Sequence, residues 1–219
     1  MQIDENKLQQ AAYDLKFLLD RGYRKKGALT FVANKYVLNK QERNYLVRSV
    51  FSSLKSKSRK GKIIDISKIK DQFLLVDGYN VLITTESICR GDYNSIILCD
   101  DMILRDLNAV FGKYKFRKIT EKALKTILDL ISSYKPSYVY FFFDSPVSFS
   151  GKLSNLTNKL MIKYNLQGSA NISKNVDFEV ISLSKEKKGI VATSDSVIID
   201  KVDKVVDIPY YILKMQKNG

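Results

Sequence analysis

Three short apolar stretches of the sequence are each followed, directly or after two residues, by an aspartate. The stretches are residues 73–76, 138–143 and 190–192, and the aspartates are Asp77, Asp144 and Asp195. Because the carboxyl ends of parallel strands meet at one edge of a sheet, we expect these three side chains to come together. The spacing therefore predicts a cluster of carboxylates that is drawn from distant parts of the chain.

Other acids stand at similar positions. Asp177 lies in residues 175–179, which are predicted to open a helix, where the positive end of the helix dipole favours an anion. Asp100 and Asp101 follow a further apolar stretch at residues 96–99. A single aspartate commonly ends a strand or caps a helix, so each alone has a structural explanation. Four or more together favour a shared chemical function.

Crowded carboxylates repel one another unless a cation compensates their charge. A cluster of oxygen ligands suits Mg²⁺ or Mn²⁺, and two such ions about 4 Å apart can activate water for phosphodiester cleavage. The chain has no histidine and only two cysteines, Cys89 and Cys99. This composition excludes the Ser-His-Asp triad, the Cys-His pair and metal sites that depend on imidazole or several thiolates. A metal-dependent nuclease is the chemistry that these residues predict.

The charge of the chain points to a polyanionic partner. Lys and Arg number 37 against 23 Asp and Glu, which gives a formal net charge of +14. Residues 1–62 hold fifteen of those cations and five of the acids, so the positive charge is concentrated in the first part of the chain. Nucleic acids and acidic substrates are the partners that such a surface favours.

The elements that must position these side chains fall into two parts. Apolar periodicity predicts three short helices over residues 5–55, with Gly22 ending the first and Asn39 and Glu42 starting the third as a capping box. Residues 55–62 are basic and lack this periodicity, so we expect a linker and a domain boundary there. We therefore predict a basic helical domain at residues 1–62 and an α/β domain at residues 63–219.

The second part alternates short apolar runs with amphipathic stretches, which is typical of a mostly parallel sheet flanked by helices. Crossover helices are predicted around residues 124–131 and 153–164. The predicted strands are residues 73–76, 96–98, 138–143, 190–192 and 205–206.

Residues 74–80, Leu-Leu-Val-Asp-Gly-Tyr-Asn, resemble the first-strand motif of the NYN branch of the PIN-like nucleases. Residues 141–144, 176–177 and 191–195 resemble the later acidic motifs of that family, in the same order, and the match spans about residues 70–206. The resemblance implies a PIN-like, Rossmann-like sheet with a catalytic metal site. Its metal ligands would be Asp77, Asp144, Asp177 and Asp195, with Asn80, Thr193 and Ser194 as neighbouring polar groups that contact the substrate. We also expect Gly78 to let the turn approach the substrate closely.

The whole chain also resembles an uncharacterised, mainly archaeal family in which a short helical domain precedes a PIN-like domain. The matching segments are residues 18–23, 99–106 and 144–151. In that family a glycine usually follows the two acids of the middle segment, whereas this chain has Met102. We expect Asp101 to be a fifth ligand or to lie just behind the ligands. Arg105 would contact a phosphate or a carboxylate, and a structural ion pair with Asp106 is the alternative.

Two further groups could contact RNA. A predicted helix junction combines cations with an aromatic ring, in residues Arg21, Tyr23, Arg24, Lys25 and Lys26. Such cations can contact successive phosphates, and the ring can stack on a base. The alternative is that Tyr23 packs between the helices and the cations are merely solvated. Lys152, with the nearby hydroxyls of Ser148 and Ser150, could bind a substrate phosphate, and a polar loop is the alternative.

Together these observations predict a metal-dependent endoribonuclease that hydrolyses RNA phosphodiester bonds. RNA as the substrate and a 5′-phosphate product are implied by the resemblance, which also allows a homodimer because PIN-like domains commonly pair. Two alternatives stay open: a non-catalytic RNA-binding protein on a PIN-like scaffold, and a DNA-binding regulator in which the second and third helices form a helix-turn-helix. Haloacid-dehalogenase phosphatase chemistry fits less well, because Tyr79 stands where that mechanism needs a second acid.

The first ten residues lack the basic start and the apolar stretch of a signal peptide. No uninterrupted apolar run approaches the length that a membrane crossing needs. We therefore expect a cytoplasmic protein without a membrane partner.

Overall fold

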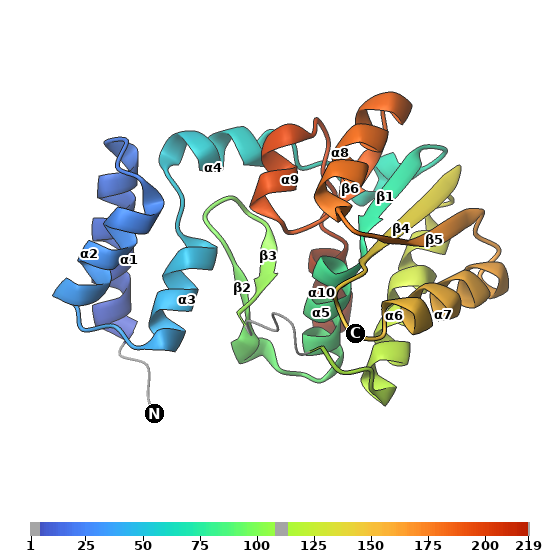
Figure 1. The fold of residues 1–219 in the computed structure, drawn as a ribbon, viewed down its shortest axis with the longest axis horizontal. Coiled ribbons are helices and arrows are strands. Elements are labelled where there is room, and N and C mark those ends of the chain that lie inside the picture. Colours follow the sequence, from blue (N-terminus) through green and yellow to red (C-terminus); the bar gives the residue numbers. More distant parts are fainter. Residues whose placement is uncertain (1–4, 108–113, 219) are drawn as a thin grey trace. The chain divides into compact units, whose positions relative to one another are not determined.

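The structure, a computed structural model, describes residues 5–107 and 114–218 (Figure 1). These residues form two compact units, one of residues 5–61 and 97–107 and the other of residues 62–96 and 114–218. The chain passes from the first unit into the second between residues 61 and 62. We expected residues 97–107 in the second domain, but they pack with the helical unit instead.

The first unit is built on three amphipathic helices, α1 (Glu5–Asp20), α2 (Lys25–Lys35) and α3 (Lys40–Ser49). Gly22 adopts φ 84 just after α1, a conformation that glycine takes without strain. The predicted capping box opens α3, since Asn39 accepts from two backbone N–H groups and Glu42 accepts from the Asn39 backbone. The helices share one apolar core, made by Leu8, Ala11, Leu15, Ala28, Val32, Ala33, Leu38, Leu46 and Val50.

Residues 53–60 are helical and form α4 (Ser53–Lys60), so our expectation of a linker over residues 55–62 was wrong. The Ser52 hydroxyl accepts from the Lys55 backbone N–H and caps this helix. Its buried residues are Ser56 and Arg59, which lie three positions apart on one face. Because the buried face is polar, α4 has no apolar periodicity that a sequence pattern could reveal.

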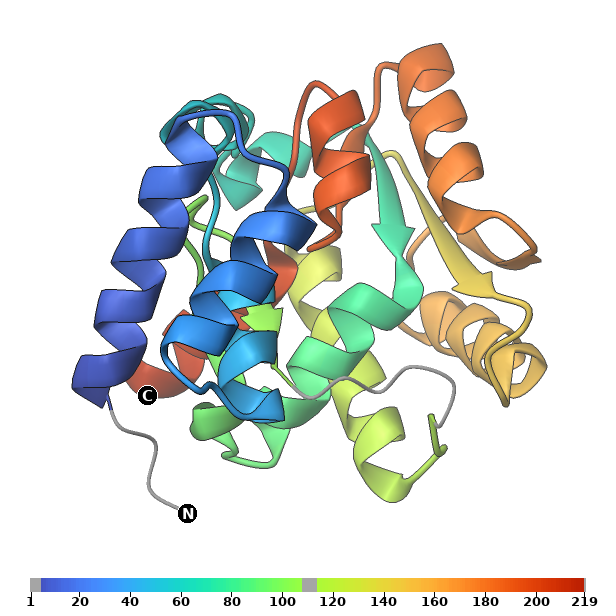
Figure 2. The same ribbon diagram turned by 60° about the vertical axis from the view of Figure 1, so that its left-hand side comes forward.

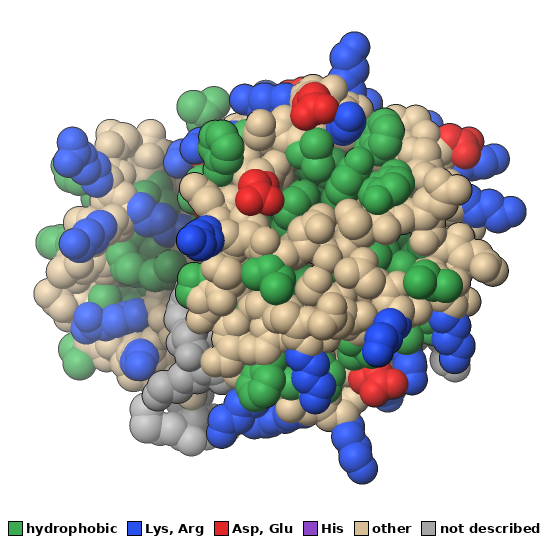
Figure 3. Space-filling view, turned by 45° about the vertical axis from the view of Figure 1, so that its right-hand side comes forward, with side chains coloured by type: hydrophobic (Ala, Val, Ile, Leu, Met, Phe, Trp, Pro, Cys, Tyr) green, Lys and Arg blue, Asp and Glu red, His purple; other side chains and the backbone are tan. Residues whose placement is uncertain are grey.

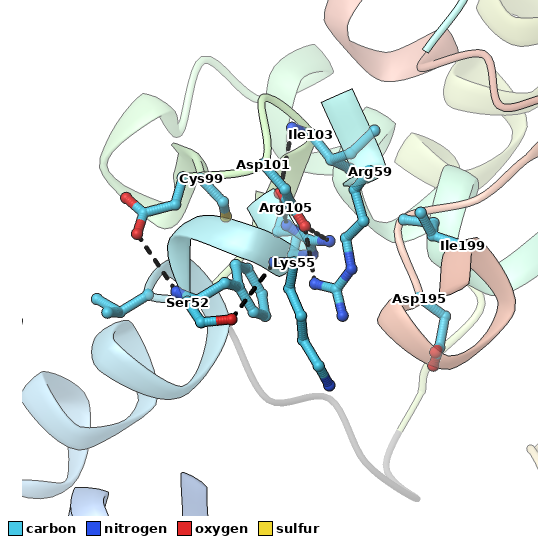
Figure 4. Close-up of polar contacts among 12 residues, drawn as sticks. Ser52, Lys55, Arg59, Cys99, Asp101, Ile103, Arg105, Asp195 and Ile199 are labelled. Carbon is cyan, nitrogen blue, oxygen red and sulfur yellow. Dashed lines mark hydrogen bonds and ion pairs between the residues drawn. The ribbon is translucent and has the colours of Figure 1, made fainter. Parts of the chain in front are cut away.

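A buried ion cluster joins residues 97–107 to the helices of the first unit. Asp101 is fully buried, and its carboxylate accepts two hydrogen bonds from Arg105, at 2.6 and 2.8 Å, and one from Arg59 at 3.0 Å (Figure 4). Asp101 lies in the turn between the paired strands β2 (Ile96–Leu98) and β3 (Leu104–Asp106). Met102, in the same turn, adopts φ 62, the conformation that a glycine would take there without strain. This ion cluster explains why the β2–β3 turn belongs to the helical unit.

The second unit contains, within the described residues, a four-stranded sheet with the order β5-β4-β1-β6. All of its strand pairs are parallel, as expected. The strands are β1 (Phe73–Asp77), β4 (Tyr138–Asp144), β5 (Gly168–Ser173) and β6 (Ile190–Ala192). The central strands β1 and β4 are largely apolar and buried, which is typical of a sheet covered on both faces.

Helices cover both faces of this sheet, as Figures 1 and 2 show. One side holds α5 (Gly78–Cys89), α6 (Lys118–Ser133), α7 (Ser150–Lys163) and α10 (Ile208–Asn218); the other holds α8 (Val176–Lys187) and α9 (Ser196–Lys201). The chain passes from β1 to β4 and on to β5, and then returns across the sheet to β6. The connections from β1 to β4 and from β4 to β5 run one way across the sheet, and the connection from β5 to β6 runs back the other way. Because such connections are right-handed, α8 lies on the other face of the sheet from α5, α6 and α7. Two 3₁₀ turns, η1 (Ile66–Ile69) and η2 (Tyr93–Ser95), complete the unit.

The strand predictions differ from the structure in three places. Residues 205–206 do not form a strand, since Val205 makes only isolated parallel bridges, with Ile63 and Val191. The expected strand at residues 96–98 exists, but it pairs with β3 instead of joining the parallel sheet. The strand β5 was not predicted, because its sequence Gly-Ser-Ala-Asn-Ile-Ser is small and polar. That composition suits a partly exposed edge strand, and it lacks the apolar run from which a buried strand is predicted.

The helices are short relative to a lipid bilayer. The helices α1 and α6 have 16 residues each, whereas a membrane-spanning helix needs about 20 apolar residues. In the described part of the chain, no helix combines the length and the apolar composition that crossing a membrane requires.

Removing the Asp101 carboxylate should destabilise the first unit strongly. The substitution Asp101→Ala leaves Arg59 and Arg105 buried without this partner, which costs about 3–5 kcal/mol of unfolding free energy. Chemical denaturation measures this loss. The control is Asp14→Ala, which removes the partly exposed partner of Lys35 and should change the midpoint far less. Equal, small effects of both substitutions would contradict a structural role for Asp101.

Candidate functional site

Four aspartates of the second unit lie at or just beyond the carboxyl edge of the parallel sheet. Asp77 is the last residue of β1, Asp144 is the last residue of the neighbouring β4, and Asp195 follows β6 on the other side of β1. Asp177 lies in the first turn of α8, the helix that follows β5. This edge is where open parallel sheets bind their ligands. We call Asp77, Asp144, Asp177 and Asp195 the carboxylate cluster.

Asp77 is the most enclosed member of the cluster, with 2% of its surface exposed. Its Oδ2 accepts a hydrogen bond from Asn80 Nδ2 at 2.6 Å and another from the Thr193 hydroxyl at 2.7 Å. The Thr193 hydroxyl in turn accepts from the Asp195 backbone N–H, and the Ser194 hydroxyl donates to Asn80 Oδ1. The three polar residues that the resemblance placed beside the ligands therefore connect the ends of β1 and β6 around Asp77.

Burial, together with the charges of neighbouring carboxylates, raises the pKa values of three members of the cluster. Burial raises the pKa of Asp77 to about 7, the charges of Asp195 and Asp144 add to this effect, and the hydrogen bonds from Thr193 and Asn80 oppose it. Burial also raises the pKa of Asp144, followed by the charges of Asp177 and Asp195. The pKa of Asp177 rises through burial and the charge of Asp195. Burial and the neighbouring carboxylates therefore disfavour the ionised forms of Asp77, Asp144 and Asp177.

Helix capping accounts for only one member of the cluster. The Asp195 side chain accepts the Val197 backbone N–H at 2.6 Å and caps α9. Asp77 stands at the N-cap position of α5, but its side chain makes no cap hydrogen bond. The cap of α8 is Asn175 and not Asp177. The structural explanation that applies to single aspartates thus leaves most of this cluster unexplained.

The chemistry of the cluster fits a hard divalent cation. In residues 5–107 and 114–218, no three His, Cys, Asp or Glu side chains are already arranged closely enough to hold a metal ion. The donors are nevertheless all oxygens, which Mg²⁺ and Mn²⁺ prefer. The charges of neighbouring aspartates add to the effect of burial on the pKa values of Asp77, Asp144 and Asp177. Both hydrogen bonds to Asp77 go to Oδ2, so Oδ1 is the atom through which this side chain could bind a cation.

The glycine that follows Asp77 is required by packing. A Cβ on Gly78 would lie 2.7 Å from the Phe142 carbonyl oxygen and would overlap the ring of Phe143. We expected this glycine to bring the turn close to a substrate, but its close neighbour is β4. The glycine therefore lets the start of α5 pack against β4, which sets the position of Asp77 and Asn80.

Two family comparisons cover most of the chain. Residues 66–211 match the family described as a domain of unknown function (DUF5616). The chain belongs to the DUF5616 family. Residues 7–62 match a second family, described as a protein of unknown function (DUF434). The uncharacterized protein MJ0935 of Methanocaldococcus jannaschii is 38% identical over 203 residues, which cover 92% of this chain and 94% of that protein.

No solved structure matches the chain. The carboxylate cluster lies entirely within the DUF5616 segment, and the predicted basic patch at residues 21–26 lies within the DUF434 segment. The two matched segments meet between residues 62 and 66, close to the boundary between the two units.

Asp101, which we expected as a fifth ligand, belongs to the other unit and is held by arginines. Burial raises its pKa, but the hydrogen bonds and charges of Arg105 and Arg59 outweigh burial and lower the pKa below its ordinary value. Both of its carboxylate oxygens accept from guanidinium groups, so the assignment as a metal ligand was wrong. Arg105 contacts a carboxylate, as predicted, and this carboxylate is that of Asp101. With 4% of its surface exposed, Arg105 offers nothing to a substrate phosphate.

The predicted basic patch lies at the α1–α2 junction of the DUF434 segment. Tyr23 is 60% exposed and therefore does not pack between the helices. Arg24 and Lys26 are exposed beside it. The guanidinium carbon of Arg21 lies 3.4 Å from the centroid of the Phe17 ring, which is itself 45% exposed. Phe17 was missed by the sequence analysis, although its position four residues before Arg21 on one helix face predicts this contact.

Lys25 does not belong to the exposed patch. Its ammonium donates to the carbonyls of Val47 and Val50 at the end of α3, at 2.7 and 2.6 Å, and lies 4.0 Å from the centroid of the Phe51 ring. Burial, followed by the charges of Arg59 and Arg105, lowers the pKa of Lys25 to about 8. The prediction that Lys25 contacts RNA is therefore wrong, because its charge stabilises a helix C-terminus.

The third predicted contact region follows Asp144. Ser150 is buried, and its hydroxyl donates to the carbonyls of Asp144 and Val147, so its function is to hold the loop. Lys152 is exposed, and its ammonium lies 4.0 Å from the centroid of the Phe116 ring. Lys152 thus remains available to a ligand, whereas Ser150 does not.

Replacing the Asp77 carboxylate by an amide should stabilise the metal-free protein. The pKa of Asp77 is about 7 in the folded state and near 4 in the unfolded state. As the pH rises between these two values, ionisation of Asp77 therefore favours the unfolded state and lowers the free energy of unfolding. This difference between the two pKa values corresponds to about 4 kcal/mol, which is the largest gain in the free energy of unfolding that the substitution can give. The variant Asp77→Asn in EDTA should therefore unfold at a higher denaturant concentration than the wild type at pH 8, and at a similar one near pH 4. A variant that is less stable at pH 8 would contradict the raised pKa.

Proposed function

We propose that the protein is a metal-dependent ribonuclease with a PIN-like α/β domain and an RNA-binding helical unit. The observation that carries this proposal is the carboxylate cluster at the carboxyl edge of the parallel sheet, with Asp77 buried and its pKa raised to about 7. A protein gains nothing in stability from such an arrangement unless a cation compensates the charge. The order of the acidic motifs along the sequence supports the PIN-like assignment.

Asp77, Asp144, Asp177 and Asp195 would hold Mg²⁺ or Mn²⁺. When bound, such an ion lowers the pKa of coordinated water and stabilises the leaving oxygen of a phosphodiester. Thr193 and Asn80 fix the orientation of the Asp77 carboxylate, and Ser194 fixes that of Asn80. Asp144 is only half-buried, so its carboxylate is accessible to water and to a bound ion.

RNA is proposed as the polyanion because of the family resemblance and the surface of the helical unit. The exposed part of the patch combines the Arg21–Phe17 stack with Tyr23, Arg24 and Lys26. Cations that follow a phosphate backbone and rings that stack bases are the usual components of a single-strand binding surface. We name these five residues the α1–α2 patch.

Cleavage should depend on the Asp77 carboxylate. Incubated with Mn²⁺ or Mg²⁺ and a panel of structured and unstructured RNAs, the wild type should cut at least one substrate, and EDTA should abolish the cut. The variant Asp77→Asn should cut it at least about 100-fold more slowly, because a bound ion supplies several kcal/mol of transition-state stabilisation.

The control for this experiment is Asp129→Asn, which changes an exposed aspartate on α6 outside the carboxylate cluster. Its rate should equal that of the wild type. Cleavage that persists undiminished in Asp77→Asn would remove the active-site assignment, since the activity would then come from elsewhere or from a contaminant.

RNA affinity should depend on the exposed cations of the α1–α2 patch. The double substitution Arg24→Ala with Lys26→Ala should weaken binding about tenfold at low salt, and should reduce the slope of log K against log salt by about 1.4 for single-stranded RNA. Fluorescence anisotropy at several salt concentrations measures both quantities. The matched control removes the same charge from the exposed face of α4, as Lys57→Ala with Lys60→Ala. An equal loss in this control would show that net charge, and not the patch, determines binding.

The same measurements separate the other functions that the sequence allows. RNA binding that depends on the α1–α2 patch, without metal-dependent cleavage of any substrate, would favour a non-catalytic RNA-binding protein. Preference for one duplex DNA sequence over random RNA would favour a helix-turn-helix regulator built on α2 and α3, which residues 36–39 connect.

A further inference from the structure

Two aromatic rings of the second unit lie close to one another, and a lysine covers one of them. The rings of Phe116 and Phe149 have centroids 6.5 Å apart, and the Lys152 ammonium lies 4.0 Å from the centroid of the Phe116 ring. Phe149 is 50% exposed, Phe116 is partly exposed and Lys152 is exposed. Burying these rings in the core would have been more favourable by the hydrophobic effect, so their exposure needs an explanation. We call Phe116, Phe149 and Lys152 the aromatic cluster.

Phe149 is held in an unfavourable backbone conformation. It adopts φ 71 and ψ 11, a left-handed conformation that a bulky residue rarely takes. The next residue, Ser150, keeps the loop in place because its hydroxyl donates to the carbonyls of Asp144 and Val147. The loop therefore holds the exposed ring at a fixed position relative to Asp144, at a cost in backbone strain, and such strain is concentrated at functional sites.

Phe116 is positioned by the same buried network. Two residues before it, the Tyr114 hydroxyl donates to Glu86 Oε1 at 2.6 Å, and the Tyr114 ring packs edge-on against Tyr79. The Tyr79 hydroxyl lies 3.0 Å from the Ser150 hydroxyl, which holds the loop of Phe149. Both exposed rings are therefore anchored to one rigid set of buried side chains, as a binding platform requires.

Exposed cations surround the rings. Lys115, Arg117 and Lys118 are all exposed and flank Phe116 in the sequence, and Lys152 covers one of its faces. The face of the molecule in Figure 3 likewise shows exposed hydrophobic side chains among Lys and Arg side chains. Alternating rings and cations suit a flexible polyanion with aromatic bases, whereas a buried protein interface is depleted of Lys.

We propose that the aromatic cluster binds one unpaired nucleotide of the RNA, with its base stacked on Phe116 and Phe149 and its phosphate near Lys152. This inference rests on the proposed function and deepens it, because it names single-stranded RNA as the substrate class. A base can reach these rings only when it is unpaired, so the nucleotide that binds at the aromatic cluster must be free of duplex structure.

Binding without cleavage tests the proposal. The full chain, in EDTA, is titrated into a single-stranded RNA oligonucleotide that carries 2-aminopurine, and into the matching blunt duplex. Phe116→Leu and Phe149→Leu keep an apolar side chain but remove the ring. Each should weaken single-strand binding roughly tenfold, change duplex binding less than twofold, and reduce the quenching of 2-aminopurine that stacking causes. Lys152→Ala should reduce the salt slope by about 0.7.

The matched control is Tyr93→Leu. Tyr93 is 46% exposed in the same unit and lies beyond the far end of α5, a helix of 12 residues that spans about 18 Å from Asp77. This variant should bind like the wild type. Single-strand affinities of both phenylalanine variants within twofold of the control would overturn the proposal, and so would a wild type that does not bind single-stranded RNA.

The two proposals fail in distinguishable ways. If the wild type cuts no RNA with Mn²⁺ but the ring variants lose single-strand affinity, the ribonuclease assignment fails and the nucleotide site stands. If cleavage depends on Asp77 while the ring variants bind and cut like the control, the nucleotide site fails and the ribonuclease assignment stands.

Discussion

The burial of Asp77 beside other carboxylates, at the end of the parallel sheet, is the constraint on which the proposed site depends. Burying the Asp77 charge costs free energy, and the charges of Asp144 and Asp195 increase the cost. Two hydrogen bonds to one oxygen offset only part of it. The surrounding structure nevertheless holds Asp77 in place, since Gly78 packs against β4 and Thr193 connects β1 to β6. The fold thus maintains this arrangement at a cost that a bound cation would offset, and this cost is the basis of the proposed metal site.

The sequence was sufficient to predict this site because its geometry follows from strand direction alone. Every parallel strand delivers its last residue to the same edge, so aspartates after apolar runs had to converge there once the sheet was parallel. Asn80 was placed beside Asp77 by the family resemblance, and the observed hydrogen bond between the two side chains agrees with their separation of about one helical turn. The same reasoning failed for Asp101, because β2 pairs with β3 and not with the parallel sheet. A strand-end aspartate is thus informative only when the strand belongs to the sheet.

The elements that were missed are those stabilised by polar contacts over long sequence distances. The helix α4 buries Arg59 and Ser56 instead of an apolar stripe, and Arg59 finds its partner Asp101 at a separation of 42 residues. The strand β5 contributes small and polar residues at an edge. Local periodicity cannot predict such partners, because the stabilising contact exists only after the chain has folded. The left-handed conformation of Phe149 could not be predicted from the sequence for the same reason. Hydrogen bonds of Ser150 and Tyr79, formed in the folded chain, offset the free energy of this backbone strain.

Net charge is also an incomplete guide to what a surface can bind. Residues 1–62 carry fifteen Lys and Arg, but the structure uses several of them internally. Arg59 is buried against Asp101, Lys25 stabilises the end of α3, and Lys7 forms an ion pair with the buried Glu42. Cations engaged in this way release no counterions when a polyanion binds, so they contribute little to its affinity. The binding strength of the helical unit should therefore follow the exposed cations that lie beside exposed rings, and not the formal charge of the segment.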